Sequence, residues 1–269
     1  MTYTHMTAAG MQLEYTWVQR PPVKGEPVLV FLHEGLGCIA MWRGFPAAVA
    51  KVCDMPGLVY SRAGYGGSDP ITLPRPITYQ EDEAGILEVV LDQLGINKAV
   101  LIGHSDGGTI ALIHAGMDNR DRVLGVVTMA AHVFNEEVCI TGIRDARKVW
   151  DSTDLREKLK RYHGDNVDNA FLGWNDTWQR ADYWHWNVEK YLPMITCPLL
   201  VMQGRDDHYG SEKQVDAIID GAGGSSKIPP EKMMIPACGH NPHFDQADLV
   251  IRAISDFMQV FHDSTPTGR

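Results

Sequence analysis

The chain has 269 residues, 44% of them hydrophobic, and a formal net charge of −10 from 34 acidic and 24 basic residues. This length suits one α/β domain, or a domain with an insertion, and is enough to bury a large core. The acidic balance argues against a nucleic-acid partner, because phosphate binding depends on clustered Lys and Arg.

The cysteines and the N-terminal residues bear on where the protein works. The five cysteines are odd in number and widely spaced, with no CxxC pair that would suggest zinc or a redox couple. The first twenty residues lack a basic start followed by an apolar core. No apolar run approaches the roughly 20 residues of a membrane helix. The sequence therefore predicts a soluble, cytoplasmic protein without a membrane partner.

Four short apolar runs predict buried parallel strands, because each run is continuous rather than alternating and ends in polar residues or glycine. They cover residues 27–33, 98–105, 122–131 and 197–204. A further short run, KMMIPA, stands at residues 232–237.

Helical stretches, with apolar positions three and four residues apart, lie between and after these strands. They cover residues 81–96, 107–117, 211–220 and 247–263. Such alternation predicts a mostly parallel sheet with helices on both faces. The Gly- and Ser-rich stretch at residues 221–230 is expected to join a helix to the last strand.

One segment, residues 132–192, interrupts the alternation. Strand patterns vanish there, and the segment holds five of the chain's seven tryptophans. We expect a helical insertion at this point, with residues 1–131 and 193–269 forming the core domain. The tryptophans could pack a small helical layer, line an apolar pocket over the sheet edge, or do both.

The segment GHSDGG lies between a predicted strand and the helix that follows it. A sharp strand-to-helix turn needs small residues two positions before and two positions after its central residue. Around Ser105 these positions hold Gly103 and Gly107, whereas a turn centred on Asp106 would place the bulky His104 there. An isolated GxSxG can arise by chance, but this placement favours Ser105 as a nucleophile.

A serine nucleophile needs a base to take its proton and an acidic group to orient that base. His240 and His243 follow the last short strand, and the Gly-His pair directly after it favours His240. Asp206 and Asp207 follow the strand before that one, although one of them could instead cap the next helix. The chain order is therefore Ser, Asp, His.

The oxyanion formed in acyl transfer also needs hydrogen-bond donors, which are usually backbone amides. The amide of Asp106 stands at the start of a helix, where free N–H groups favour negative charge. The loop HEGLG, after the first predicted strand, offers Gly35 as a second donor, with Leu36 as the alternative. This loop could also be a plain turn.

Together these features resemble the α/β-hydrolase superfamily. YSRAGYGGSD at residues 60–69 is similar to the family's stretch after the strand that precedes the nucleophile. QGRDDHYG is similar to its Gly-x-x-Asp turn, which selects Asp207 as the acid. The resemblance implies an α/β-hydrolase fold, a helical cap at residues 132–192, and catalysis by Ser105, Asp207 and His240. LHEGLG, GHSDGG and GWNDTW resemble a bacterial branch without a single settled substrate.

Two residues depart from the family pattern. Glu34 replaces the glycine of the usual His-Gly pair in the oxyanion loop, and Asp106 stands where many relatives carry an apolar residue or glutamine. Both carboxylates could be solvated or paired with Arg62. Alternatively, they could bind a polar group of the substrate or tune His240.

We therefore predict a serine hydrolase that cleaves a carboxylic ester, or a related acyl bond, of a small and partly apolar or aromatic substrate. We expect neither a metal nor an organic cofactor, and the sequence is compatible with a homo-oligomer. The candidate pocket residues are Glu34, His132, Trp174, Trp178 and Trp184.

Other chemistries remain open at this stage. The same three residues could cleave a thioester or a carbon–carbon bond next to a ketone. A cofactor-free dioxygenase would use Ser105 only for binding. From another class, a ligand receptor could retain the catalytic residues without turnover.

Overall fold

The computed structural model describes residues 3–222 and 228–263. An eight-stranded sheet runs through this part of the chain in the order β1-β2-β4-β3-β5-β6-β7-β8. Neighbouring strands from β4 to β8 are parallel, whereas β2 is antiparallel to both β1 and β4. The strands span Thr4–Ala8 (β1), Met11–Val18 (β2), Val28–Leu32 (β3), Gly57–Tyr60 (β4), Ala99–His104 (β5), Val123–Met129 (β6), Leu199–Gly204 (β7) and Glu231–Ile235 (β8). This is the mostly parallel sheet that the sequence predicts.

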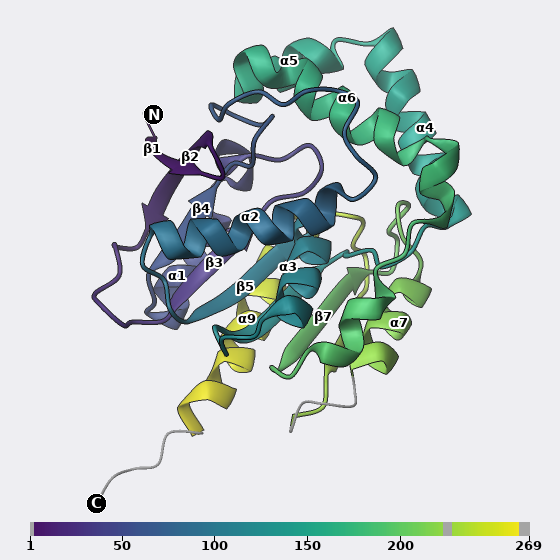
Figure 1. Cartoon of the computed structure of the whole chain (residues 1–269). Helices are drawn as coiled ribbons and strands as arrows, with labels where there is room; N and C mark the ends of the chain where they lie inside the picture. The colour runs from purple at the N-terminus through teal and green to yellow at the C-terminus, as the bar shows by residue number, and fades with distance from the viewer. Residues whose placement is uncertain (1–2, 223–227, 264–269) are drawn as a thin grey trace, which may run out of the picture.

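Helices cover both faces of the sheet (Figure 1). One face carries α1 (Phe45–Cys53) and α9 (Ala247–Asp263), and the other carries α2 (Tyr79–Gln93), α3 (Asp106–Met117) and α7 (Glu212–Ala222). Shorter helical turns are η1 (Ile39–Trp42) and α8 (Pro242–Asp245).

The side chains of β3 show how the two faces are filled. Val28, Val30 and Leu32 belong to the apolar cluster under α2 and α3, while Leu29 and Phe31 belong to the cluster under α1 and α9. Successive side chains of a strand point to opposite faces, so a strand covered on both sides is apolar throughout. This is why the central strands appear in the sequence as continuous apolar runs.

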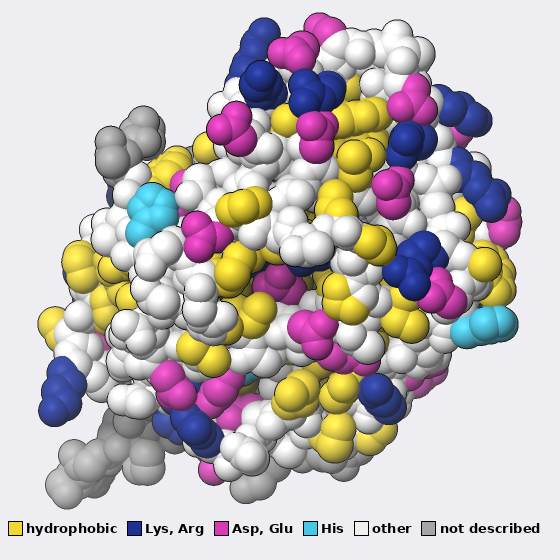
Figure 2. All heavy atoms as spheres, turned by 45° about the horizontal axis from the view of Figure 1, so that its top comes forward, with side chains coloured by type: hydrophobic (Ala, Val, Ile, Leu, Met, Phe, Trp, Pro, Cys, Tyr) yellow, Lys and Arg dark blue, Asp and Glu magenta, His cyan; other side chains and the backbone are white. Residues whose placement is uncertain are grey.

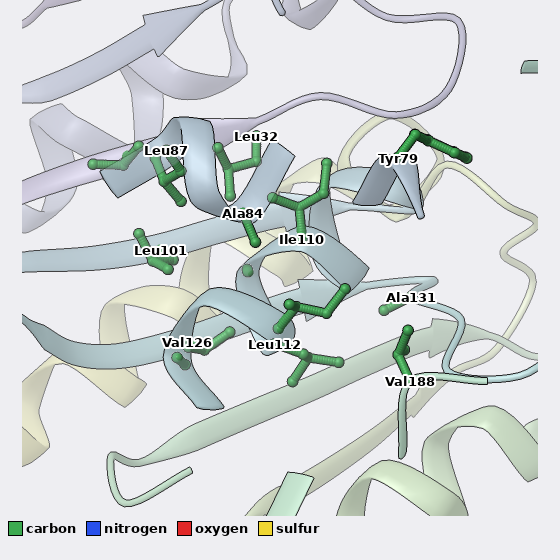
Figure 3. Packing of buried hydrophobic residues seen from close by; sticks show 14 of the residues in the cluster. Leu32, Tyr79, Ala84, Leu87, Leu101, Ile110, Leu112, Val126, Ala131 and Val188 are labelled. Carbon is green, nitrogen blue, oxygen red and sulfur yellow. The ribbon is translucent and has the colours of Figure 1, made fainter. Parts of the chain in front are cut away.

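Figure 3 shows the first of these clusters from close by. Leu87 of α2 and Ile110 and Leu112 of α3 pack over Leu101 of β5 and Val126 of β6. All five side chains are buried. The packing fixes α3, and with it the turn that precedes α3, against the centre of the sheet.

The predicted strands and helices are confirmed to within three residues at each end. Within the stretch 221–230, residues 223–227 lie outside the described residues. The structure adds the strands β1, β2 and β4 and the helix α1, none of which is among the predicted strands and helices.

The hairpin turn explains why β1 and β2 escape prediction. Ala9 and Gly10 connect the strands, and both have positive φ angles, 50° and 79°, as in a type I′ turn. The usual Asn-Gly or Asp-Gly signal of that turn is absent. The sequence of β2, MQLEYTW, does alternate apolar and polar residues, so its period of two was a usable signal that the sequence analysis missed.

Between β6 and β7, residues 132–194 form a helical segment with α4 (Glu137–Ser152), α5 (Leu155–His163) and α6 (Val167–Trp178). Three 3₁₀ turns complete it: η2 (Gly164–Asn166), η3 (Ala181–His185) and η4 (Glu189–Met194). Figure 1 shows α4 to α6 as a layer at the top of the molecule, above α2. Ile143, Leu159 and Phe171 of this layer belong to the same apolar cluster as the residues under α2 and α3.

The outer surface of the helical segment is highly charged. In Figure 2, acidic and basic side chains are intermixed over this part of the molecule. Exposed ion pairs join its helices, such as Arg147 with Asp176 at 2.7 Å and Arg156 with Asp168 at 2.7 Å. Exposed pairs contribute at most about 1 kcal/mol each, so the apolar contacts beneath them hold the segment in place.

Among the described residues, no helix combines the length and the apolar character needed to cross a membrane.

Candidate active site

Ser105 stands at the turn between β5 and α3 with φ 50° and ψ −118°. A residue with a side chain rarely adopts these angles, so the turn is strained. A Cβ atom at Gly103 would overlap the Gly107 carbonyl, and one at Gly107 would overlap the Leu32 carbonyl. The turn therefore requires glycine on both sides of Ser105, as the steric argument predicts.

In the structure His240 lies within hydrogen-bond distance of both Ser105 and Asp207. His240 Nε2 lies 3.0 Å from Ser105 Oγ, and His240 Nδ1 lies 2.9 Å from Asp207 Oδ2. The amide of Tyr209 also donates to Asp207 Oδ1, at 2.8 Å. Because the carboxylate accepts the hydrogen on Nδ1, Nε2 of the neutral ring is left to accept a proton from Ser105.

The alternative acid and base lie elsewhere. Asp206 is exposed, whereas the side chain of Asp207 is only 1% exposed. His243 packs between Trp42 and Phe45, with ring centroids 5.0 Å and 5.5 Å away. Burial lowers the pKa of His243 to about 2, so this ring stays neutral.

The protonation states of His240 and Asp207 suit proton transfer from Ser105. Burial lowers the pKa of the His240 imidazole below its usual value, and the Asp207 carboxylate offsets only part of this effect. Burial by itself raises the pKa of the Asp207 carboxyl, but the charge and hydrogen bond of His240 lower it overall. At neutral pH a neutral base thus stands beside an ionised carboxylate.

The loop after β3 is held by its own hydrogen bonds. His33 Nδ1 donates to the Glu34 carbonyl at 2.7 Å, and His33 Nε2 accepts the Arg62 amide at 3.1 Å. The Arg62 guanidinium donates to the carbonyl oxygens of His33 and Glu34. Burial is the largest effect lowering the pKa of His33, which keeps the ring neutral and able to accept. The backbone that carries Gly35 and Leu36 is fixed as a result.

The candidate oxyanion donors lie on this loop and on α3. Asp106 is the first residue of α3, and the first amides of a helix have no partner within the helix. Gly35 and Leu36 both line the same cavity as Ser105. A Cβ atom on Gly35 would overlap the Trp174 indole, so the ring lies directly against the loop. Which amides hold the oxyanion stays a prediction.

The two unusual carboxylates have partners other than Arg62. Asp106 Oδ2 accepts the Tyr79 hydroxyl at 2.7 Å, and that hydroxyl accepts Trp178 Nε1 at 2.8 Å. Glu34 Oε2 lies 3.5 Å from His104 Nδ1. The Asp106 side chain is buried in its network, whereas the Glu34 side chain remains 21% exposed.

A cavity of about 230 Å³ lies beside Ser105. Part of its wall comes from residues just after β3, β5, β6, β7 and β8, namely Glu34, Ser105, His132, Tyr209 and His240. The cavity therefore lies outside the carboxyl ends of the strands, where open α/β sheets bind their ligands.

The opposite wall comes from the helical segment, which contributes Cys139, Ile143, Leu159, Trp174 and Trp178. Of the predicted pocket residues, Glu34, His132, Trp174 and Trp178 line the cavity. The prediction for Trp184 is wrong: its side chain is 44% exposed and lies outside the cavity wall. Within η3, its neighbour Tyr183 is the ring that turns inward and stacks on Trp186 at 5.3 Å.

Sequence reasoning missed several wall residues. Tyr209 stands two residues after Asp207, and Asn241 directly follows His240, so their proximity in the sequence was a usable signal. Cys139 and Ile143 are four residues apart on one face of α4, a spacing that marks an inward-facing stripe. Nothing in the sequence indicates that this stripe meets Ser105.

This chain is similar to known proteins in both sequence and structure. The model of the "Alpha/beta hydrolase family" matches residues 29–253. "Serine hydrolase BPHL" of Mus musculus is 29% identical over 201 residues, which cover 73% of this chain and 67% of that protein. The 2-succinyl-6-hydroxy-2,4-cyclohexadiene-1-carboxylate synthase of Serratia proteamaculans (strain 568) is 23% identical over 260 residues, covering 86% of this chain and 93% of that one. The enol-lactonase structure from Burkholderia xenovorans LB400 has a TM-score of 0.71 at 20% identity and covers 95% of this chain and 100% of that chain.

Replacing Gly107 with Ala is expected to lower the free energy of unfolding by at least about 2 kcal/mol, because the added methyl group overlaps the Leu32 carbonyl. Gly85→Ala is the matched control. Gly85 lies within α2, where a Cβ atom meets nothing within 4 Å, so alanine should stabilise the helix by up to about 1 kcal/mol. Thermal denaturation of both variants measures the difference. A melting temperature of G107A equal to that of the wild type would refute the steric requirement.

Proposed function

Since the chain belongs to the alpha/beta hydrolase family, we propose that it is a serine hydrolase that cleaves a carboxylic ester of a small, partly apolar substrate. The observation that carries this proposal is the hydrogen-bonded series of Ser105, His240 and Asp207 beside a cavity. A serine alone is a poor nucleophile at neutral pH, and such a series is how proteins activate it.

In the proposed reaction, Ser105 Oγ attacks the substrate carbonyl while His240 Nε2 takes its proton. Asp207 keeps the imidazole in the required orientation and stabilises its charged form. The oxyanion accepts hydrogen bonds from the amides of Asp106 and of Gly35, or of Leu36 in its place. His240 then gives the proton to the leaving alcohol, and water releases the acyl group by the same steps.

The cavity supports a small substrate with an apolar or aromatic part. Its volume of about 230 Å³ exceeds the ~150 Å³ of a cavity that binds benzene, but lies below the roughly 300 Å³ at which typical ligand pockets begin. Trp174 and Trp178 supply flat apolar walls. His132 donates from Nε2 to the Tyr209 carbonyl at 2.9 Å, and its buried Nδ1 has no hydrogen-bond partner in the described chain.

We further propose that residues 132–192 form a cap over a core domain of residues 1–131 and 193–269. The wall residues that α4, α5 and α6 contribute to the cavity support this division. The five cysteines are free thiols, which supports a reducing compartment such as the cytoplasm.

The names of the similar proteins support this chemistry without fixing the bond. They include a serine hydrolase and an enol-lactonase, but also a synthase. A thioester, or a carbon–carbon bond next to a ketone, is the alternative that the same three residues could cleave. A panel of aryl esters, thioesters and β-diketones separates these bonds.

Ser105→Ala is expected to lower kcat/KM on the best substrate of that panel by at least about a thousandfold, because no other group replaces the nucleophile. Ser152→Ala, in the exposed last turn of α4, is the control and should retain full activity. Wild-type turnover by S105A would remove the assignment. Oxygen uptake during turnover would indicate a dioxygenase, and a single modification without turnover would indicate a receptor.

The proposal also fixes the direction of the pH dependence. Protonated His240 cannot accept the Ser105 proton, and burial lowers the pKa of His240. We therefore expect kcat/KM to rise with pH and to reach half of its plateau below about pH 6.5. Asp207→Asn should move this midpoint to still lower pH, because the carboxylate raises the pKa of His240, and should reduce the plateau by about a thousandfold or more. A midpoint above neutral pH would be incompatible with His240 as the base.

A further inference from the structure

Glu34 and the buried His104 form a pair that the proposed reaction does not use. His104 Nε2 lies 2.7 Å from the His240 carbonyl oxygen, and since a carbonyl only accepts, this nitrogen carries a hydrogen. The other ring nitrogen, Nδ1, lies 3.5 Å from Glu34 Oε2. Nδ1 makes no hydrogen bond within the described chain, so the Glu34 carboxylate contacts the ring without a hydrogen bond to it.

Of these two side chains, Glu34 is the one that faces the cavity. The His104 side chain is 0% exposed, whereas that of Glu34 is 21% exposed and forms part of the cavity wall. Burial by itself raises the pKa of the Glu34 carboxyl, but the adjacent His104 imidazole lowers it overall. Glu34 is thus an ionised carboxylate at neutral pH.

The loop makes room for this carboxylate. A Cβ atom on Gly37 would overlap Glu34 Oε2, so the glycine at this position lets the carboxylate fold back over the loop. The Gly37 amide donates to the Glu34 carbonyl at 3.1 Å and closes the turn beneath it. The carboxylate therefore lies against the loop and lines the same cavity as Ser105.

The cavity wall holds no opposite charge for an anionic ligand. Among the described residues that line it, Glu34 is the carboxylate, and none is Lys or Arg. The Arg62 guanidinium contacts this loop, but Arg62 is only 1% exposed and donates to the carbonyl oxygens of His33 and Glu34. Its charge is directed at the loop backbone and at the Tyr65 ring, whose centroid is 5.0 Å away.

We propose that Glu34 is a specificity-determining residue that excludes anionic substrates from the cavity and selects neutral or positively charged ones. As a preference in kcat/KM, this selection rests on the proposed ester hydrolysis. It adds to that proposed function the charge class of the substrate. Two like charges at close range repel strongly where the effective dielectric constant is low. We therefore expect an anionic substrate to be disfavoured about tenfold or more relative to a neutral one.

The kinetic test uses two substrates of the same shape and different charge, the acetyl esters of para-hydroxybenzamide and para-hydroxybenzoate. The wild type should prefer the neutral amide by about tenfold or more in kcat/KM, and Glu34→Gln should reduce that preference at least about fivefold. Glu137→Gln, at a side chain that is 74% exposed, is the matched control and should leave the preference unchanged.

The ratio of the two rates isolates charge from structure. Any general loss of folding or of His240 positioning lowers both rates together and leaves the ratio as it was. A wild type without preference for the neutral ester, or an unchanged ratio in E34Q, overturns the proposal.

A binding experiment on Ser105→Ala makes the test independent of turnover. Calorimetry should give a dissociation constant for benzamide that is at least about tenfold lower than that for benzoate. The added Glu34→Gln substitution should reduce the ratio of the two dissociation constants. Equal affinities, tighter binding of benzoate, or no binding of either ligand overturns the proposal. If the wild type hydrolyses neither ester while benzamide still binds more tightly than benzoate, the proposed function fails and the charge selection stands.

Discussion

The close backbone approach around Ser105 is the constraint on which the rest of the site depends. Gly103 and Gly107 let β5 and α3 meet beside the end of β3 without room for a side chain at either position. That contact forces Ser105 to a φ of 50° and presents its hydroxyl at the carboxyl edge of the sheet. The strain is tolerated because the buried residues of α3 anchor the helix on both neighbouring strands. A hydroxyl in this position is reached from the loops after β7 and β8, which supply Asp207 and His240.

Hydrogen bonds from buried side chains tie the surrounding loops to this turn. His104, the residue before the nucleophile, holds the His240 carbonyl and so connects the β8 loop to β5. Asp106, the residue after it, reaches Trp178 of α6 through the Tyr79 hydroxyl. Trp174, from the same helix, lies against Gly35. The helical segment therefore contacts both the nucleophile turn and the loop after β3, so its packing and the geometry of the site depend on each other.

Much of this arrangement could be predicted from the sequence, and the reasons are physical. The central strands are covered by helices on both faces, so continuous apolar runs mark them in the sequence. The turn at Ser105 needs glycine on both sides, and GHSDGG meets this requirement at a definite place between a strand and a helix. The β1–β2 hairpin escaped because its turn uses Ala9 in place of the usual Asn or Asp, although β2 does alternate apolar and polar residues. Trp184 was placed in the pocket from the density of aromatic residues alone, although in a 3₁₀ turn adjacent side chains face different directions. The partners of Glu34 and Asp106 depend on contacts between distant segments, which no local pattern encodes.

The central claim is that His240, oriented by Asp207, activates the Ser105 hydroxyl. Labelling with a fluorophosphonate, followed by peptide mapping, measures that activation without knowledge of the substrate. We expect one adduct per folded chain, on Ser105, with a labelling rate that falls by orders of magnitude in His240→Ala and in the heat-unfolded protein. An adduct on a different residue, or equal labelling rates in the wild type and in H240A, would contradict it.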